Sequence, residues 1–165
     1  VDRNHNLNLF MRNFADLVKL SPVNKLKVDA AALVRSVAAF MQVKAEEHRV
    51  KLELRDIETF YVMADAQQME QALINVVKNA IEAIEGEGIV TVDLDKSTGV
   101  LRISDTGRGI SEEMSEQLFS PFFSTKKDGQ GIGLTLVREV LLNHGFEFSL
   151  ATVEPGRTEF IIRFS

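Results

Sequence analysis

The segment from Ala66 to Glu85 carries the strongest helical pattern in the chain. It therefore constrains the possible folds more than any other segment. At about 100° per residue, a helix over this segment has one apolar side and one polar side. Gly86 and Gly88 then end it. A helix with one apolar side must bury that side against another layer of structure. The apolar side comprises Met69, Leu73, Val76, Val77, Ala80, Ile81 and Ile84.

Strand-like segments occur in pairs between helices. Val50, Leu52 and Leu54 alternate with charged residues, and TFYVMAD (59–65) is predicted to form the neighbouring strand. The order of elements predicts an α+β fold, a two-layer α/β sandwich with helices on one face of a mixed sheet. The further predicted strands are IVTVDLD and VLRIS, which flank the turn KSTG as a hairpin, and FEFSLATV and TEFIIRF. The further predicted helices cover residues 28–48 with Asp29 as N-cap, residues 112–119 behind Ser111, and residues 134–144.

An amphipathic segment precedes these elements. Apolar residues recur there at spacings of three and four, and Pro22 follows them. We therefore expect residues 1–22 to be an appended element and residues 23–165 to form one domain. The recurring residues are Leu7, Phe10, Phe14, Leu17 and Val18.

The composition excludes several classes of function. The net charge is −5, from 19 basic and 24 acidic side chains, so there is no basic field for a nucleic-acid backbone or an anionic membrane. The absence of cysteine excludes a disulfide framework and a thiolate metal site, and fits a reducing cytoplasm. No apolar run approaches the roughly 18 residues that span a bilayer. An anionic ligand must therefore be held locally, by a few placed groups.

Two asparagines on the polar side of the helix over residues 66–85 need an explanation. Asn75 and Asn79 lie one turn apart, although asparagine is a poor helix former. One interpretation is a solvated polar face. The other is that the amide oxygens coordinate a hard cation such as Mg²⁺, which takes oxygen ligands and substrate phosphates.

Two glycine clusters allow similar alternatives. GQGIGL (129–134) leads into a helix, where glycines and the helix start favour a phosphate, but it lacks the lysine and hydroxyl residue of a P-loop. The glycines can equally belong to an ordinary loop that binds no ligand. DTGRGI (105–110) can be a simple turn, or a site where Asp105 reads a ligand. A carboxylate repels phosphate and accepts a hydrogen bond from an exocyclic amine.

The ordered combination of these segments is more specific than any one of them. Asn75 and Asn79 in NVVKNAIEAI, then DTGRGI, FSPFFSTK and GQGIGL, resemble the N, G1, F and G2 boxes of sensor histidine kinases. These kinases belong to the superfamily that also holds gyrase, the Hsp90 type of chaperone and the MutL type of repair ATPase. The ending GRTEFIIRF is similar to the family's closing GTxFxIxLP strand, with Arg157 in place of its glycine and without the terminal LeuPro.

The resemblance implies an ATP site in a Bergerat fold. It implies that Asp105 accepts from the adenine amino group with Thr158 in support, and that Asn79 is the Mg²⁺ ligand with Asn75 as its polar partner. It places a cation at Lys126, or at Lys127 beside it, near the phosphates. The implied catalytic residues are Asn75, Asn79 and Lys126. The implied ATP-binding residues are Asn75, Asn79, Asp105, Gly107, Gly109, Ile110, Phe119, Phe122, Phe123, Thr125, Lys126, Gly129, Gly131, Ile132, Gly133, Leu134 and Thr158.

The acceptor histidine of the family is not found in this chain. In the family it begins a motif such as HExxNP on a dimerising hairpin, and none of His5, His48 and His144 lies in such a motif. The resemblance therefore implies a cytoplasmic catalytic fragment of a homodimeric kinase, with residues 1–22 as the end of the second hairpin helix. The implied partners are that hairpin and a response regulator. The alternatives are a serine kinase of the anti-sigma type and an ATP-gated interaction module.

Overall fold

The computed structural model describes residues 22–117 and 132–164. The predicted helix before Pro22 and the FSPFFSTK segment lie outside these residues. The described helices are α2 (Ala30–Glu47), α3 (Ala66–Glu82), α4 (Glu112–Gln117) and α5 (Ile132–His144). The strands are β1 (Leu26–Asp29), β2 (Val50–Arg55), β3 (Tyr61–Ala64), β4 (Gly88–Asp95), β5 (Val100–Asp105), β6 (Glu147–Glu154) and β7 (Arg157–Arg163).

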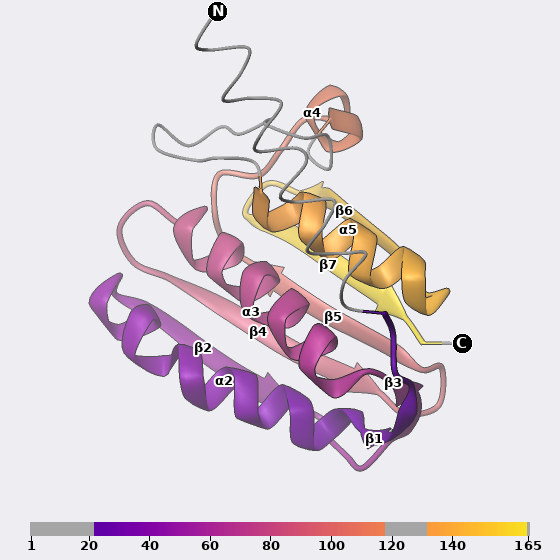
Figure 1. The fold of residues 1–165 in the computed structure, drawn as a ribbon. Coiled ribbons are helices and arrows are strands. Elements are labelled where there is room, and N and C mark those ends of the chain that lie inside the picture. The colour runs from indigo at the N-terminus through magenta and orange to yellow at the C-terminus, as the bar shows by residue number, and fades with distance from the viewer. Residues whose placement is uncertain (1–21, 118–131, 165) are drawn as a thin grey trace, which may run out of the picture.

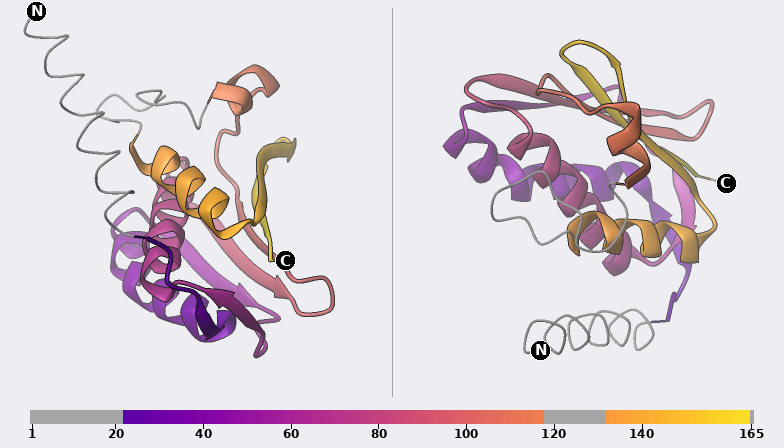
Figure 2. Two further views of the ribbon diagram at one scale, coloured as in Figure 1. Left: turned by 45° about the vertical axis from the view of Figure 1, so that its right-hand side comes forward. Right: turned by 90° about the horizontal axis from the view of Figure 1, so that it is seen from above.

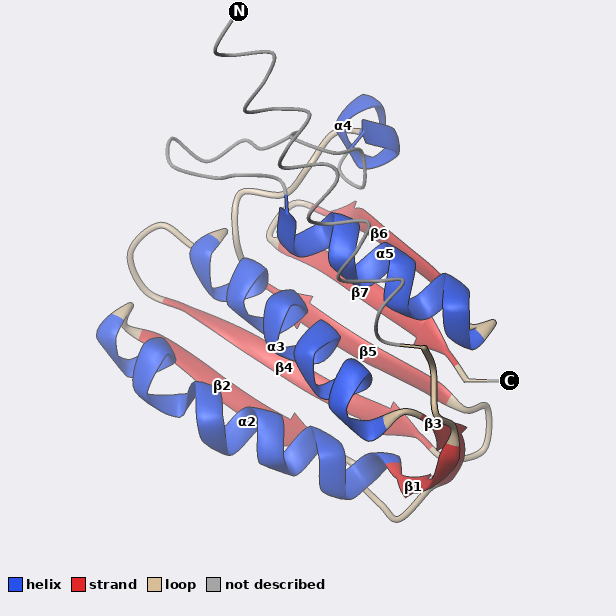
Figure 3. Ribbon diagram, viewed as in Figure 1, coloured by secondary structure: helices blue, strands red, loops and turns tan. Residues whose placement is uncertain are grey.

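Five strands form one mixed sheet in the order β2–β4–β5–β7–β6 (Figure 1). β2 and β4 are parallel, with α3 in the crossover between them, and the remaining neighbours are antiparallel. Helices α2, α3 and α5 lie along one face of this sheet in both views of Figure 2, and Figure 3 shows the same separation of helices and strands. The predicted α+β sandwich is confirmed.

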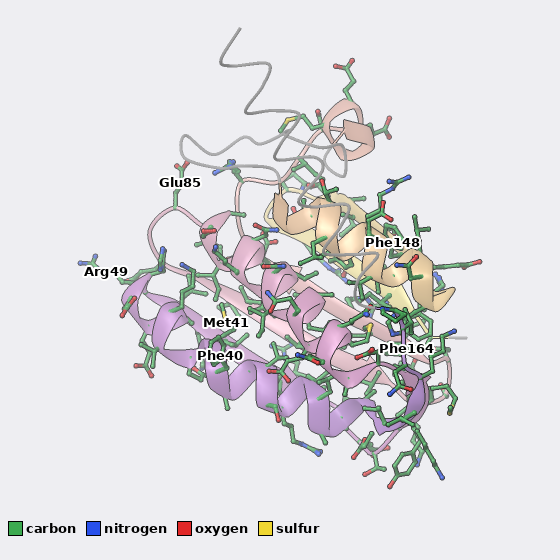
Figure 4. All side chains as sticks on the ribbon, viewed as in Figure 1. Phe40, Met41, Arg49, Glu85, Phe148 and Phe164 are labelled. Atoms are coloured by element: carbon green, nitrogen blue, oxygen red, sulfur yellow. The ribbon has the colours of Figure 1, made fainter. Side chains whose placement is uncertain are left out.

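The core lies between the helices and the covered face of the sheet. All seven residues of the predicted apolar side are buried: six lie in α3, which ends at Glu82 rather than at the predicted Glu85, and Ile84 follows its end. Alternate residues of the sheet strands are buried too. On α2, Met41 is buried while the adjacent Phe40 is 68% exposed on the outer side (Figure 4). The buried sheet residues include Val50, Leu52, Val90, Val92, Leu94, Leu101, Ile103, Phe160 and Ile162. Within the described part of the chain, no helix is long and apolar enough to cross a membrane.

The other face of the sheet carries charges paired across the strands. Arg102 of β5 lies 3.2 Å from Asp93 of β4 and 3.6 Å from Glu159 of β7. Arg157 lies 2.9 Å from the same Glu159. Opposite charges on neighbouring strands stabilise a sheet face that the described helices leave uncovered. Arg157 thus belongs to this charged face, whereas its neighbour Thr158 is buried.

Two local predictions were wrong. The strand within TFYVMAD does not pair with β2; it is β3, which pairs with β1 in a separate two-stranded sheet. Val28 lies in β1 rather than in the helix that follows. Backbone bonds explain the arrangement, because Ala30 N–H donates to Phe60 O at 2.7 Å and Phe60 N–H donates to the Asp29 carboxylate at 3.2 Å. These bonds tie the start of β3 to the end of β1, and β4 takes the place beside β2.

His144 joins the end of α5 to the start of α3. Its ring is buried, with Nδ1 2.7 Å from Val140 O, and Nε2 accepts from Asp65 N–H at 3.0 Å. Asp65 is the N-cap of α3 and also accepts from Asn24 N–H. Lys25 Nζ donates to His144 O at 3.3 Å. The segment before β1 is therefore held at the junction of two helices.

We predict that His144 makes stability fall at acid pH. Burial lowers the pKa of His144 from 6.5, so below about pH 6.5 the unfolded chain takes up a proton that the folded chain does not. Its contribution to stability is complete above this pH and is lost as the pH falls. The free energy of unfolding of His144→Gln, measured by urea titration from pH 7.5 to 5.5, should therefore fall less steeply than that of the wild type. His48→Gln, at an exposed histidine, is the control and should keep the wild-type slope. Equal slopes for all three proteins would contradict the prediction.

Candidate functional site

One end of the covered sheet face is polar where the rest is apolar. Asp105, the last residue of β5, pairs with Thr158 of β7, and Thr158 pairs with Thr152 of β6. Directly paired residues point to the same face of a sheet. Strand alternation puts these three on the covered face, in line with the buried Ile103 and Phe160. The structure therefore brings the predicted residues Asp105 and Thr158 together.

The Asp105 carboxylate is buried and has few partners. The residue is 7% exposed, and its Oδ1 accepts from Gly107 N–H at 2.9 Å. No other donor within the described residues bonds to this carboxylate. Burial raises the pKa of Asp105 to about 6, against the opposing effects of the Gly107 bond and the Arg108 charge. A buried carboxylate with one donor from its own chain retains capacity to accept a hydrogen bond from a ligand.

The loop after Asp105 is fixed between α3 and β6. A Cβ at Gly107 would lie 2.5 Å from Ala83 O, the carbonyl at the end of α3 to which Arg108 N–H also donates. Gly109 has φ +79°, and a Cβ there would lie 2.7 Å from Thr152 Oγ1. Ile110 N–H donates to the same Thr152 oxygen at 2.7 Å. The two glycines are therefore required for close packing within the chain.

Asn75 and Asn79 lie in the second half of α3, the half that leads to the loop. Asn75 and Asn79 are half-buried, unlike side chains on a fully solvated face. Asn79 lies one helical turn before Ala83, whose carbonyl contacts the Gly107 loop. No cluster of three histidine, aspartate or glutamate side chains that could hold a metal occurs in the described ranges. The asparagine amide oxygens nevertheless fit Mg²⁺, because that ion is held by few protein oxygens together with substrate phosphates.

The second glycine cluster leads into this end of the molecule. α5 begins at Ile132, inside GQGIGL, and runs antiparallel to α3, so its start lies beside the end of α3 (Figure 1). Ile132 and Gly133 are its first two residues, and Leu134 packs against the core. The ligand contacts predicted for these three residues stay predictions. The remaining predicted residues lie outside the described ranges: Phe119, Phe122, Phe123, Thr125, Lys126, Gly129 and Gly131.

Three contributors to the site were missed by sequence reasoning. Thr152 forms hydrogen bonds with both the loop and Thr158. The Ala83 carbonyl accepts a hydrogen bond from Arg108 N–H of the loop. The Thr106 hydroxyl accepts from Ile89 N–H at 3.0 Å, so it fastens the loop to the start of β4. Neither a threonine at an alternating strand position nor a backbone carbonyl can be recognised from the sequence as part of a site. Their roles follow only from strand register and loop path.

Comparison with known proteins agrees with this geometry. The model of the family described as histidine kinase-, DNA gyrase B-, and HSP90-like ATPases matches residues 64–165. The chain belongs to this family. Its fold is therefore the Bergerat fold, with Asp105, the following loop and Thr158 all inside the matched segment.

Individual members of this ATPase family are similar over most of the chain. The sensor histidine kinase ZraS of Salmonella typhi is 28% identical over 160 residues, which cover 94% of this chain and 34% of ZraS. The chain thus spans about a third of the length of the curated relatives it matches. The catalytic domain of the histidine kinase ThkA is 30% identical with a TM-score of 0.72, over 84% of this chain and 93% of that domain. A structure of ThkA in complex with the response regulator protein TrrA gives 25% identity and a TM-score of 0.74, over 96% of this chain and 48% of ThkA.

We predict that Asp105→Asn stabilises the chain in the absence of ligand. The raised pKa means that ionised Asp105 opposes folding fully above about pH 6, and that this cost is relieved as the pH falls from 6 towards 3.8. Asparagine removes the charge and keeps an oxygen for Gly107 N–H. The melting temperature of the variant should therefore exceed that of the wild type by a few degrees at pH 7.5, with a smaller difference at pH 4.5. A variant that is less stable than the wild type at pH 7.5 would contradict this account.

Proposed function

We propose that the chain binds Mg-ATP and transfers its γ-phosphoryl group to a histidine on a separate dimerisation hairpin, in two-component signal transduction. The observation that carries the proposal is the buried Asp105 carboxylate at the end of β5, which has a single donor among the described residues. It lies within the segment that matches the ATPase family. The sensor kinases ZraS and ThkA are the similar proteins that support it.

The two ends of the site have different tasks in this proposal. Asp105 accepts from the adenine amino group, a hydrogen bond that a carboxylate makes well and a guanine oxygen cannot supply. The phosphates lie between Asn75 and Asn79 on α3 and the start of α5, because the first backbone N–H groups of a helix favour an anion. Asn79 would hold Mg²⁺ together with the phosphates, and the ion would supply positive charge against the charge that develops during transfer.

The nucleophile in this proposal comes from outside the described residues. A neutral imidazole nitrogen attacks the γ-phosphorus as the bond to the bridging oxygen breaks, and ADP leaves. His144 is unsuitable because it is buried and both its ring nitrogens have partners. His48 is exposed, but it ends α2 and bonds Lys44 O through Nδ1. In keeping with the resemblance to sensor histidine kinases, we take a hairpin histidine as the acceptor. Catalysis then rests on placing the γ-phosphate in line with it.

The arrangement of the parent protein is part of the same proposal. Residues 1–22 would be the end of the second hairpin helix and residues 23–165 the ATP-binding domain. The junction at Asn24 and Lys25, held by Asp65 and His144, would set where the hairpin leaves the domain. The parent would be a cytoplasmic homodimer in this region and would pass phosphate to a response regulator, in keeping with the complex of ThkA with TrrA.

We predict that Asp105→Asn weakens ATP binding by about tenfold or more. A hydrogen bond to a charged group contributes roughly 1.5–3 kcal/mol, and the substitution removes the charge. Isothermal titration calorimetry with Mg-ATP measures the change. Asp95→Asn, at an exposed carboxylate at the far end of β4, is the matched control and should bind as the wild type does. Unchanged affinity in Asp105→Asn would remove the proposed adenine contact.

We predict that Asn79→Ala abolishes Mg²⁺-dependent phosphorylation of a hairpin. The chain is mixed with labelled ATP and the isolated dimerisation hairpin of a sensor kinase, and acid-labile phosphate on the hairpin is counted with and without Mg²⁺. Gln71→Ala, at an exposed position on the polar side of the same helix, should retain transfer. Metal-dependent transfer that persists in Asn79→Ala would exclude its role as the ligand. Acid-stable phosphoserine on a partner protein would instead favour a serine kinase.

A further inference from the structure

Thr152 connects the loop after Asp105 to the neighbouring strand. Its Oγ1 accepts from Ile110 N–H at 2.7 Å and lies 2.9 Å from Thr158 Oγ1. The same oxygen would lie 2.7 Å from a Cβ at Gly109, so the loop backbone rests directly against it. One side chain of β6 therefore fixes both the loop and the residue that lies opposite Asp105.

The surroundings of the two hydroxyl groups favour one direction for the hydrogen bond between them. Each hydroxyl has one hydrogen and accepts through its lone pairs. Thr152 Oγ1 already accepts from Ile110 N–H, and a single hydrogen occupies the bond between the two threonines. Thr158 is paired with Asp105 on the same sheet face, so the negative carboxylate attracts the Thr158 hydrogen to its own side. Either hydroxyl could be the donor in this bond. The neighbouring carboxylate favours the arrangement in which Thr152 donates to Thr158 and the Thr158 hydrogen points to the Asp105 side.

We propose that Thr152 is a positioning residue that directs the Thr158 hydroxyl, so that the site presents a donor beside the Asp105 acceptor. This inference rests on the proposed function of ATP binding. Adenine has an amino group beside a ring nitrogen that accepts, and this edge matches an acceptor next to a donor. Guanine has an oxygen beside a ring N–H, which is the reverse pattern. Thr152 therefore contributes to the preference for adenine indirectly, through the Thr158 hydroxyl.

The test combines variants of the full 165-residue chain with modified nucleotides. Thr152→Val removes the hydroxyl and keeps the shape, Thr152→Ser keeps the hydroxyl, and Thr91→Val is the matched control on the charged face of the sheet. Affinities for ATP, 1-deaza-ATP and 7-deaza-ATP are measured by calorimetry, and the thermal unfolding of each variant is recorded. The two analogues each lack one of the ring nitrogens that flank the amino group.

The proposal predicts a specific pattern of affinities. In the wild type, one analogue binds several-fold more weakly than ATP because the Thr158 hydroxyl loses its acceptor. Thr152→Val should bind ATP up to about tenfold more weakly and should no longer distinguish ATP from that analogue. Thr152→Ser and Thr91→Val should behave as the wild type does. The double variant Thr152→Val with Thr158→Val should lose no more than Thr158→Val alone, since both act through one hydroxyl.

The possible results distinguish failure of the Thr152 inference from failure of the proposed ATP binding. If Thr152→Val weakens ATP and both analogues by the same factor, or leaves ATP affinity unchanged, Thr152 does not direct the hydroxyl and the inference is wrong. The inference is also wrong if the wild type distinguishes neither analogue from ATP. If the wild type binds ATP and Asp105→Asn does not, the proposed function survives any of these results. If the folded wild type binds no ATP, the proposed function and the inference fall together.

Discussion

The candidate site depends on a carboxylate placed where the rest of the sheet is apolar. Asp105 continues the alternation of Leu101 and Ile103 onto the covered face, so its burial is imposed by the strand itself. Burying a charge is costly unless partners compensate it, and here the Gly107 amide is the one donor among the described residues. The Gly107 loop packed on the Ala83 carbonyl and the pairing of Asp105 with Thr158 surround this group.

Helix α3 links the core to the site because its two sides serve different purposes. The buried side packs on the sheet and fixes the helix against β5 and α5. The end of the same helix offers the Ala83 carbonyl to the loop, while Asn75 and Asn79 lie on the preceding turns. A shift of α3 on the sheet would therefore move the asparagines and the loop together. Rigid packing of the apolar side is what gives the polar side a defined position.

The sequence predicted the parts of this site that depend on local pattern. The strong periodicity of α3, the hairpin of β4 and β5, and the capping residues Asp29 and Ser111 are all confirmed, because each is set by neighbours along the chain. The resemblance also singled out Asp105 and Thr158, which the structure pairs on neighbouring strands. The partner of β3 was wrong because alternation predicts a strand without specifying which strand it pairs with. Thr152 was missed for a related reason, since only the register of β6 on β7 puts it beside Thr158.

Two buried titratable groups act at opposite ends of the helix layer with opposite signs. His144 lies where α5 meets the N-cap of α3, and its lowered pKa makes the fold weaker as the pH falls. Asp105 lies near the other end of α3, and its raised pKa makes the fold stronger as the pH falls through 6. In the free chain the two effects have opposite directions as the pH falls. A ligand that donates to Asp105 favours the ionised carboxylate, because the hydrogen bond stabilises the charged form. Binding would thus lessen the gain in stability that protonation of Asp105 gives the free chain, so the pH dependence of stability differs between the free and the occupied site.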